Sequence, residues 1–528
     1  MTIRHILAWA IMLCCGCDYP QKLPQNTSKL LRLCFEYEPI TIDPRKNSDP
    51  VSCRLINMLY EGLVHLEPDG SVSLGLAQSI DISTNLTRYT IHLKNALWSN
   101  GEPITAYDIE HSWKSLLSPD FNSVNAYFLY PIHNAHAAKI GKASLDDVGI
   151  YAQDPNTLII DLEHPTSHFL KMLAFVTFLP ISKNADLESK EHTQPVFSGP
   201  FLLQEWKHND SLTLKKNPFF WDASHVLLDT IHISIISDSN TALQLYQQGE
   251  IDWLENPLEN LSLAELSNVY TTSTIHSVDD AATTMCFFNL QCFPFNNAHI
   301  RKAFAYAIEK EPILEYLCQG IPAYGVIPPL LKEGKCTKII PVGSQTLARH
   351  YFELGLKETG LSKETFPLLT FSTYTSSLQK NLALTLQQQW YSTLGVRTSI
   401  ETSDIKIFLD KLYKKNYQFA LMSIKGQYFD PMNFLERFIS PLAPKNFSGW
   451  EHMEFPYLTA IIAETTEPEE RCTLIEAAES LIMQDAPVAP IYHQTSTYMS
   501  HHYVQGVQVS PVGLVDFRYT DLQNNPHN

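Results

Sequence analysis

The stretch at residues 417–435 reads YQFALMSIKGQYFDPMNFL. Its apolar run, 419–422, has the length of a buried strand. The segment that follows, 425–431, holds a glycine, aromatic residues and an Asp-Pro pair, which are typical of a loop. A buried strand that ends in a polar and aromatic loop is a common ligand position in α/β proteins. The stretch therefore predicts a ligand loop facing a second lobe; an ordinary surface loop is the alternative.

Length and charge narrow the class of protein. The chain has 528 residues, enough for roughly two to four domains, and its 44% hydrophobic content allows a full globular core. The net charge of −18 disfavours binding to nucleic acid or to an anionic membrane through a basic face, because neutralising phosphates requires clustered Lys and Arg. We therefore expect a globular body without a nucleic-acid partner.

The N-terminus has the pattern of an export signal. Arg4 and His5 precede an apolar run at 6–13, which leads into Cys14-Cys15-Gly16-Cys17. The run is too short to span a bilayer as a helix. It resembles a bacterial lipoprotein signal with lipidation at Cys17; Cys15 is the alternative acceptor, and a plain cleaved signal is a second alternative. This predicts a signal peptide at 1–17, a linker at 18–28, and export to the periplasm or cell surface with a lipid anchor.

The sequence offers no arrangement typical of a metal site or a catalytic site. Seven further cysteines are scattered without a CxxC pair, so we expect no zinc site, whereas export permits disulfides. The histidine pairs at 133/136 and 501/502 lack other ligands at metal-binding spacing. The phosphate-loop and nucleophile-elbow motifs are absent from the sequence. We predict a protein that is not an enzyme and has neither a metal nor a cofactor.

Hydrophobic periodicity and turn residues predict alternating strands and helices. Thr105, with Asp108 three residues on, is close to a capping box at a helix start. Strands are predicted at 30–37, 88–93, 148–152 and 157–162, and helices at 51–63, 105–116, 298–318, 346–356 and 378–394.

An ordered set of short motifs resembles one known family. The motifs are WSNGEPITAYD at 98–108 with SW at 112–113, SGPF at 198–201, NPFFWDA at 217–223, YQQGEID at 246–252, FPFN at 293–296, IRKAF at 300–304 and DP at 430–431. Together they resemble the bacterial extracellular solute-binding proteins of the oligopeptide/dipeptide/nickel group (family 5). The resemblance implies a bilobal α/β periplasmic-binding-protein fold. Its discontinuous lobe I would comprise 28–62, 197–283 and 501–522, with an inserted subdomain at 63–196 and lobe II at 284–500.

The same resemblance implies which residues face the interlobe cleft. An extended peptide in such a cleft is held mainly by main-chain hydrogen bonds, in the manner of an added strand. The residues expected there are Asp49, Asn125, Tyr127, Trp253, Glu255, Asn256, Met285, Cys286 and Phe287.

The loop at 425–431 departs from the peptide-binding members of that family. Those members carry an Asp that pairs with the ammonium group of the peptide; here Gln427 stands in its place. A buried ammonium needs an anion or several acceptors, and Gln427 supplies a neutral carbonyl. Further expected ligand positions are Gln379, Ile405, Tyr428 and Asp430, where Gln379 and Ile405 replace a His and a Trp. Asp430, Glu255 or Asp49 could supply the missing charge, the ligand could lack an α-ammonium there, or the alignment could be shifted.

The resemblance implies a function in uptake. The chain would be the monomeric substrate-binding lipoprotein of an ABC importer that captures oligopeptides and passes them to membrane permease subunits. One alternative is a different solute, such as glutathione, a cell-wall peptide or a metal complex. Another is a surface lipoprotein with a chaperone or host-interaction role.

Overall fold

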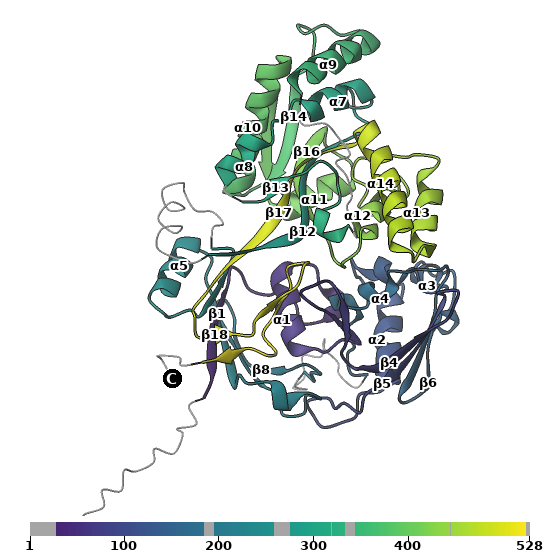
Figure 1. The fold of residues 1–528 in the computed structure, drawn as a ribbon, viewed down its shortest axis with the longest axis vertical. Helices are drawn as coiled ribbons and strands as arrows, with labels where there is room; N and C mark the ends of the chain where they lie inside the picture. The colour runs from purple at the N-terminus through teal and green to yellow at the C-terminus, as the bar shows by residue number, and fades with distance from the viewer. Residues whose placement is uncertain are drawn as a thin grey trace, which may run out of the picture.

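The computed structural model describes residues 28–183, 195–257, 275–317, 319–332, 344–443 and 445–523. The predicted signal peptide, with Cys15 and Cys17, lies outside these residues. Figure 1 shows two bodies, each built of strands and helices, one above the other. The predicted bilobal α/β fold is confirmed.

The lower body contains a sheet in the order β1-β10-β9-β8. Strand β1 (Leu30–Phe35) pairs in parallel with β10 (Thr230–Ile235), about two hundred residues later in the chain. The first lobe is thus discontinuous, as predicted. The sheet is completed by β9 (Ser211–Lys216) and β8 (Phe201–Lys207), and the short strands β18 (Val504–Gln505) and β21 (Asp521–Leu522) pair beside it.

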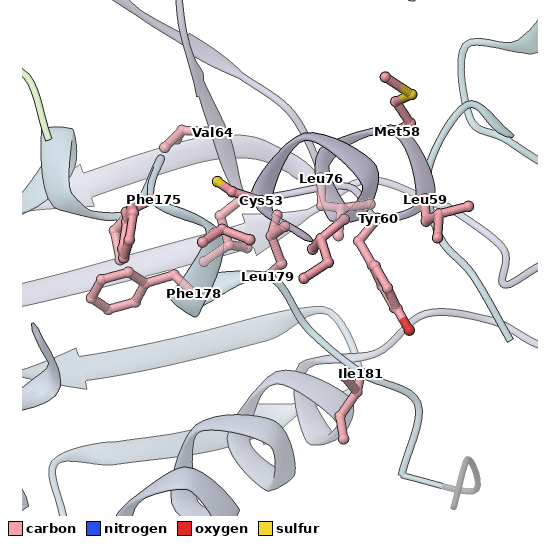
Figure 2. Close-up of a cluster of buried hydrophobic side chains, with 14 of the residues drawn as sticks. Cys53, Met58, Leu59, Tyr60, Val64, Leu76, Phe175, Phe178, Leu179 and Ile181 are labelled. Atoms are coloured by element: carbon pink, nitrogen blue, oxygen red, sulfur yellow. The ribbon is translucent and has the colours of Figure 1, made fainter. Parts of the chain in front are cut away.

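Helix α1 (Pro50–Leu59) is the centre of the lower core. Asp49 caps its first turn by accepting a hydrogen bond from the backbone N–H of Ser52, and Pro50 suits the first turn because it needs no N–H partner there. Figure 2 shows side chains of this helix and the turn after it lying near Phe175, Phe178 and Leu179. The lower sheet and the inserted subdomain therefore share one hydrophobic core.

The inserted subdomain holds a second four-stranded sheet in the order β4-β5-β7-β6. Helix α2 (Ala106–Leu117) begins with the predicted capping box of Thr105 and Asp108. The strands predicted at 148–152 and 157–162 are present as an antiparallel pair, β6 and β7. The elements are β2 (Val64–Leu66), β3 (Val72–Leu74), β4 (Ala77–Ile82), β5 (Arg88–Leu93), η2 (Ala126–Leu129), α3 (Ala135–Lys139), β6 (Ile150–Asp154), β7 (Thr157–Asp161) and α4 (Phe169–Met172).

The upper body is organised around a seven-stranded sheet. Its order is β11-β17-β12-β16-β14-β15, with β13 (Ile321–Pro322) paired to β17. The strands are β11 (Trp253–Glu255), β17 (Val488–Ser500), β12 (His276–Phe288), β16 (Phe419–Lys425), β14 (Leu369–Tyr374) and β15 (Thr398–Ser403). Strands β12 and β17 each have 13 residues and run from the upper body down to the lower one (Figure 1). The predicted boundary at 283/284 falls inside β12, which is one continuous strand. The predicted domain limits are not tested further and remain a prediction.

The helices of the upper body largely follow the predicted periodicity. The pattern at 298–318 is divided into α7 (Ala298–Tyr306) and α8 (Glu311–Leu317), because Pro312 fits only the first turn of a helix. Helices α9 (Gln345–Thr359) and α10 (Ser377–Leu394) cover the predicted segments. The others are α11 (Ile405–Tyr413), α12 (Met432–Leu435), α13 (Phe455–Glu464) and α14 (Pro468–Asp485). Within the described residues, none of the helices is long and apolar enough to cross a membrane.

Candidate functional site

The loop that follows β16 lies at the boundary between the two bodies. Strand β16 lies inside its sheet, and Phe419, Ala420 and Leu421 of the predicted run 419–422 are buried; the strand extends three residues beyond that run. The loop leaves the strand at Gly426, whose N–H donates to the carbonyl of Ala281 at 2.6 Å. On the opposite side, Phe429 packs so closely on Gly70 of the inserted subdomain that an added Cβ would lie 2.0 Å from its ring. The loop is therefore held from both bodies.

Tyr127 and Gln427, two predicted site residues that are far apart in the sequence, meet at this loop. The Tyr127 hydroxyl donates to the side-chain carbonyl of Gln427 at 2.8 Å, across 300 residues of sequence. Lys445 completes a triangle, because its Nζ lies 2.7 Å from Gln427 Oε1 and 2.8 Å from Tyr127 Oη. Sequence reasoning missed Lys445, and no motif around it could have identified it. Burial lowers the pKa of the Lys445 ammonium well below its ordinary value, and the Arg437 charge adds to this effect.

Tyr428 also bridges the two bodies. Its ring stacks on His168 of the inserted subdomain, with 5.6 Å between ring centroids and 12° between planes. Its hydroxyl donates to Glu436 Oε2 at 2.9 Å. Burial raises the pKa of Glu436 to about 7. Tyr428, one of the predicted site residues, thus serves interlobe packing and is itself 1% exposed.

The carboxylate of Asp430 is occupied within the protein. It is 1% exposed and accepts from Arg471 Nη2 of α14 at 2.7 Å. Lys171 Nζ of the inserted subdomain lies 3.8 Å away, and the backbone N–H of Met432 donates to it at 3.0 Å. Burial opposes ionisation, but His168, Arg471 and Lys171 outweigh it and lower the pKa of Asp430. Asp430 is therefore buried, and its charge is already balanced by Arg471 and Lys171.

Glu255, the last residue of β11, is likewise paired. Its Oε2 lies 2.9 Å from Arg54 Nη1, and the same guanidinium lies 3.4 Å from Glu36 Oε1. Asn256 follows with φ of +46°, a left-handed conformation that asparagine tolerates better than most residues. Trp253 is 4% exposed and stacks on Tyr498 at 4.3 Å, so it belongs to the core beside the site.

Asp49 differs from the other two predicted carboxylates because one of its oxygens is buried without a hydrogen-bond partner among the described residues. Oδ1 caps α1, whereas Oδ2 is buried and has no hydrogen-bond partner among the described residues. The turn that carries it is fixed by Asn125, whose Nδ2 donates to the carbonyl of Asn47 at 2.7 Å. Asn125 therefore acts through the backbone of this turn, and Asp49 keeps an acceptor available.

Several expected ligand positions lie inside the upper body instead. Met285, Cys286 and Phe287 are at most 2% exposed, because β12 is a central strand with a hydrophobic core on each face of its sheet. Their backbone groups are also engaged by β16 and β17. Gln379 is 2% exposed on α10, where it accepts from Thr373. Ile405 is exposed at the first turn of α11. The structure does not bring these five residues to an open face together.

A separate pocket of about 60 Å³ lies between α1, the inserted subdomain and the C-terminal segment. Its lining includes Asn57, Tyr60, His65, Leu514 and Arg518. No group of three or more His, Cys, Asp or Glu side chains that could hold a metal ion occurs among the described residues.

Comparisons with known proteins find similarity in sequence and in fold over most of the chain. Residues 71–446 match the middle region of the bacterial extracellular solute-binding proteins, family 5. The oligopeptide-binding protein OppA of Bacillus subtilis is 35% identical over 92% of each chain. A probable deoxycholate-binding periplasmic protein of Escherichia coli, YgiS, is 28% identical over 96% of each chain. The structure of the Escherichia coli murein tripeptide binding protein MppA superposes with a TM-score of 0.82 at 25% identity, covering 94% of this chain and 99% of that one. This chain belongs to the bacterial extracellular solute-binding proteins of family 5.

Proposed function

We propose that this chain is the substrate-binding component of an ABC importer, and that it captures oligopeptides between its two bodies and delivers them to a membrane permease. The observation that carries this proposal is the 35% identity to an oligopeptide-binding protein over 92% of both chains. The position of the 425–431 loop between the bodies supports it, since ligands of two-lobed α/β proteins bind where loops of both lobes meet. The protein would act as a monomer, without cofactor and without catalysis.

Ligand capture would proceed by hinge closure. Strands β12 and β17 pair with each other from His276 and Tyr498 to Phe287 and Val488, and so connect the two bodies. A few residues at the ends of such connections can absorb the rotation that closes two lobes on a ligand. The contacts of Tyr127, Tyr428 and Phe429 would then form part of the closed interface.

We further propose that the protein is exported and anchored to a membrane through a lipidated Cys17. The sequence pattern of residues 1–17 supports this, and the disulfide bond of Cys472 suits an oxidising compartment. Labelled fatty acid should be incorporated into the wild-type chain and not into Cys17→Ala. Cys15→Ala is the matched control and should keep the label; loss of label from Cys15→Ala alone would move the anchor to that residue.

Thermal denaturation of the purified protein with a ligand panel tests the transport proposal. Mixed di- to pentapeptides should raise the midpoint, because a ligand at a hundred times its Kd stabilises by about 2.7 kcal/mol. Deoxycholate and glutathione serve as competing solutes. Stabilisation by one of these, together with none by any peptide, would overturn the oligopeptide proposal.

A different solute is the second candidate function. It is favoured by Gln427, which replaces an expected carboxylate and already contacts Lys445. The presence of a probable deoxycholate-binding protein among the relatives also supports it. The same panel separates the two candidates.

A further inference from the structure

The side chain of Gln427 has a fixed orientation at the boundary between the bodies. Lys445 Nζ donates a hydrogen bond to the amide oxygen of Gln427 at 2.7 Å. The Tyr127 hydroxyl donates to the same oxygen while it accepts from Lys445. Both bonds to this oxygen therefore come from inside the protein.

The amide nitrogen of Gln427 remains as the group available to a ligand. The side chain is partly exposed, and Nε2 donates no hydrogen bond to any group within the described residues. The backbone of the residue is held as well, since its N–H donates to Asn433 Oδ1 at 3.2 Å. The loop thus offers a pre-oriented donor where a carboxylate would have offered an acceptor.

The charges around this amide also disfavour a cation. Lys445 Nζ lies 2.7 Å from the amide oxygen of Gln427, and the charge of Arg437 acts on Lys445. The nearby acids are neutralised or engaged: Asp430 pairs with Arg471, and Glu436 accepts from Tyr428. A ligand ammonium here would meet the basic side chains of Lys445 and Arg437 and an amide donor, whereas a carboxylate or carbonyl oxygen would meet complementary groups.

We propose that Gln427, backed by Lys445 and Tyr127, forms a subsite that selects an oxygen acceptor of the ligand, a carboxylate or an acyl carbonyl, and rejects a free ammonium. This inference rests on the proposed peptide-binding function and names the ligand class within it. The acceptor could come from an acylated amino terminus or from the carboxyl terminus of a peptide bound in the opposite direction.

Isothermal titration calorimetry with derivatives of one pentapeptide tests the proposal. The peptide is prepared with a free, acetylated or succinylated amino terminus, each with a free or amidated carboxyl terminus. The wild-type protein should bind an acceptor-bearing form roughly 10- to 100-fold more tightly than the free-amine, amidated form, as expected for a hydrogen bond to a charged group. Preference that follows acylation assigns the acceptor to the amino terminus, and preference lost on amidation assigns it to the carboxyl terminus.

Variants connect that preference to the named residues. Lys445→Met should abolish it, Lys445→Arg should keep it, and the exposed Lys414→Met should not affect it. Gln427→Asp combined with Lys445→Met should reverse the preference toward the free amine. Equal or tighter binding of the free-amine, amidated form to the wild type overturns the inference while peptide binding stands. Failure of every peptide to bind, to a protein with a native circular dichroism spectrum, overturns the proposed function and the inference with it.

Discussion

Replacing Asp430 by Asn distinguishes a structural ion pair from a ligand anchor. The carboxylate is 1% exposed and bonds Arg471, which is itself 6% exposed. Removing one partner of a buried pair leaves the other charge without compensation, which costs about 3 to 5 kcal/mol. We therefore expect Asp430→Asn to lower the free energy of unfolding by about that amount, and ligand affinity to change little once the protein is folded.

Urea denaturation followed by circular dichroism measures the effect. Asp410→Asn is a matched control, because Asp410 pairs with Lys414 in an exposed i,i+4 contact and should contribute less than about 1 kcal/mol. Adding Arg471→Met to Asp430→Asn should recover part of the loss, since it removes the unpaired charge.

The pH dependence provides a second measure. The pKa of Asp430 is lowered in the folded protein, so its contribution is present above the unfolded pKa of about 3.9 and is lost as pH falls below it. The difference between wild type and variant should therefore shrink in acid. A loss of stability below about 1 kcal/mol together with loss of ligand binding would refute the reasoning and make Asp430 the anchor.

Three smaller perturbations test other contacts. The raised pKa of Glu436, about 7 against 4.5 for the free side chain, means that folding takes up a proton and that stability falls as pH rises between these values. As pH rises across that window, the free energy of unfolding of Glu436→Gln should increase by up to about 3 kcal/mol relative to that of the wild type, as measured in urea titrations. A stability difference between the two proteins that does not change with pH would contradict this. Gly70→Ala should lower the free energy of unfolding by about 1 to 3 kcal/mol, because the added Cβ clashes with Phe429 and the residue has a φ of +82°. Gly360→Ala is the control: it has open space around it, so only the strain of its own positive φ should lower its stability. Thr105→Ala should cost about 1 kcal/mol of unfolding free energy through loss of the α2 cap, and no change would show that Asp108 suffices.

Local patterns in the sequence predicted many of the helices and strands, and the family resemblance of the ordered motifs implied the fold class. Capping residues, turns and apolar periodicity depend on neighbours a few residues apart, so the capping box of Thr105 and the strand at 419–422 could be predicted directly. The division of the 298–318 pattern into two helices follows from the same local rules, because Pro312 fits only the first turn of a helix. The candidate site was less accessible to such reasoning. Met285 and Phe287 have residue types that suit either a cleft or a core, and only their place on a central strand decides for the core.

The sequence by itself determined the family, the order of the elements and the residue at each site position, including Gln427 in place of a carboxylate. The tertiary structure decided which charges are already paired. Asp430 meets Arg471, Glu255 meets Arg54, and Gln427 meets Lys445, across sequence separations that no local pattern encodes. Whether a polar side chain can serve a ligand depends on the hydrogen bonds and charges it has already satisfied, and these are set by contacts between distant segments.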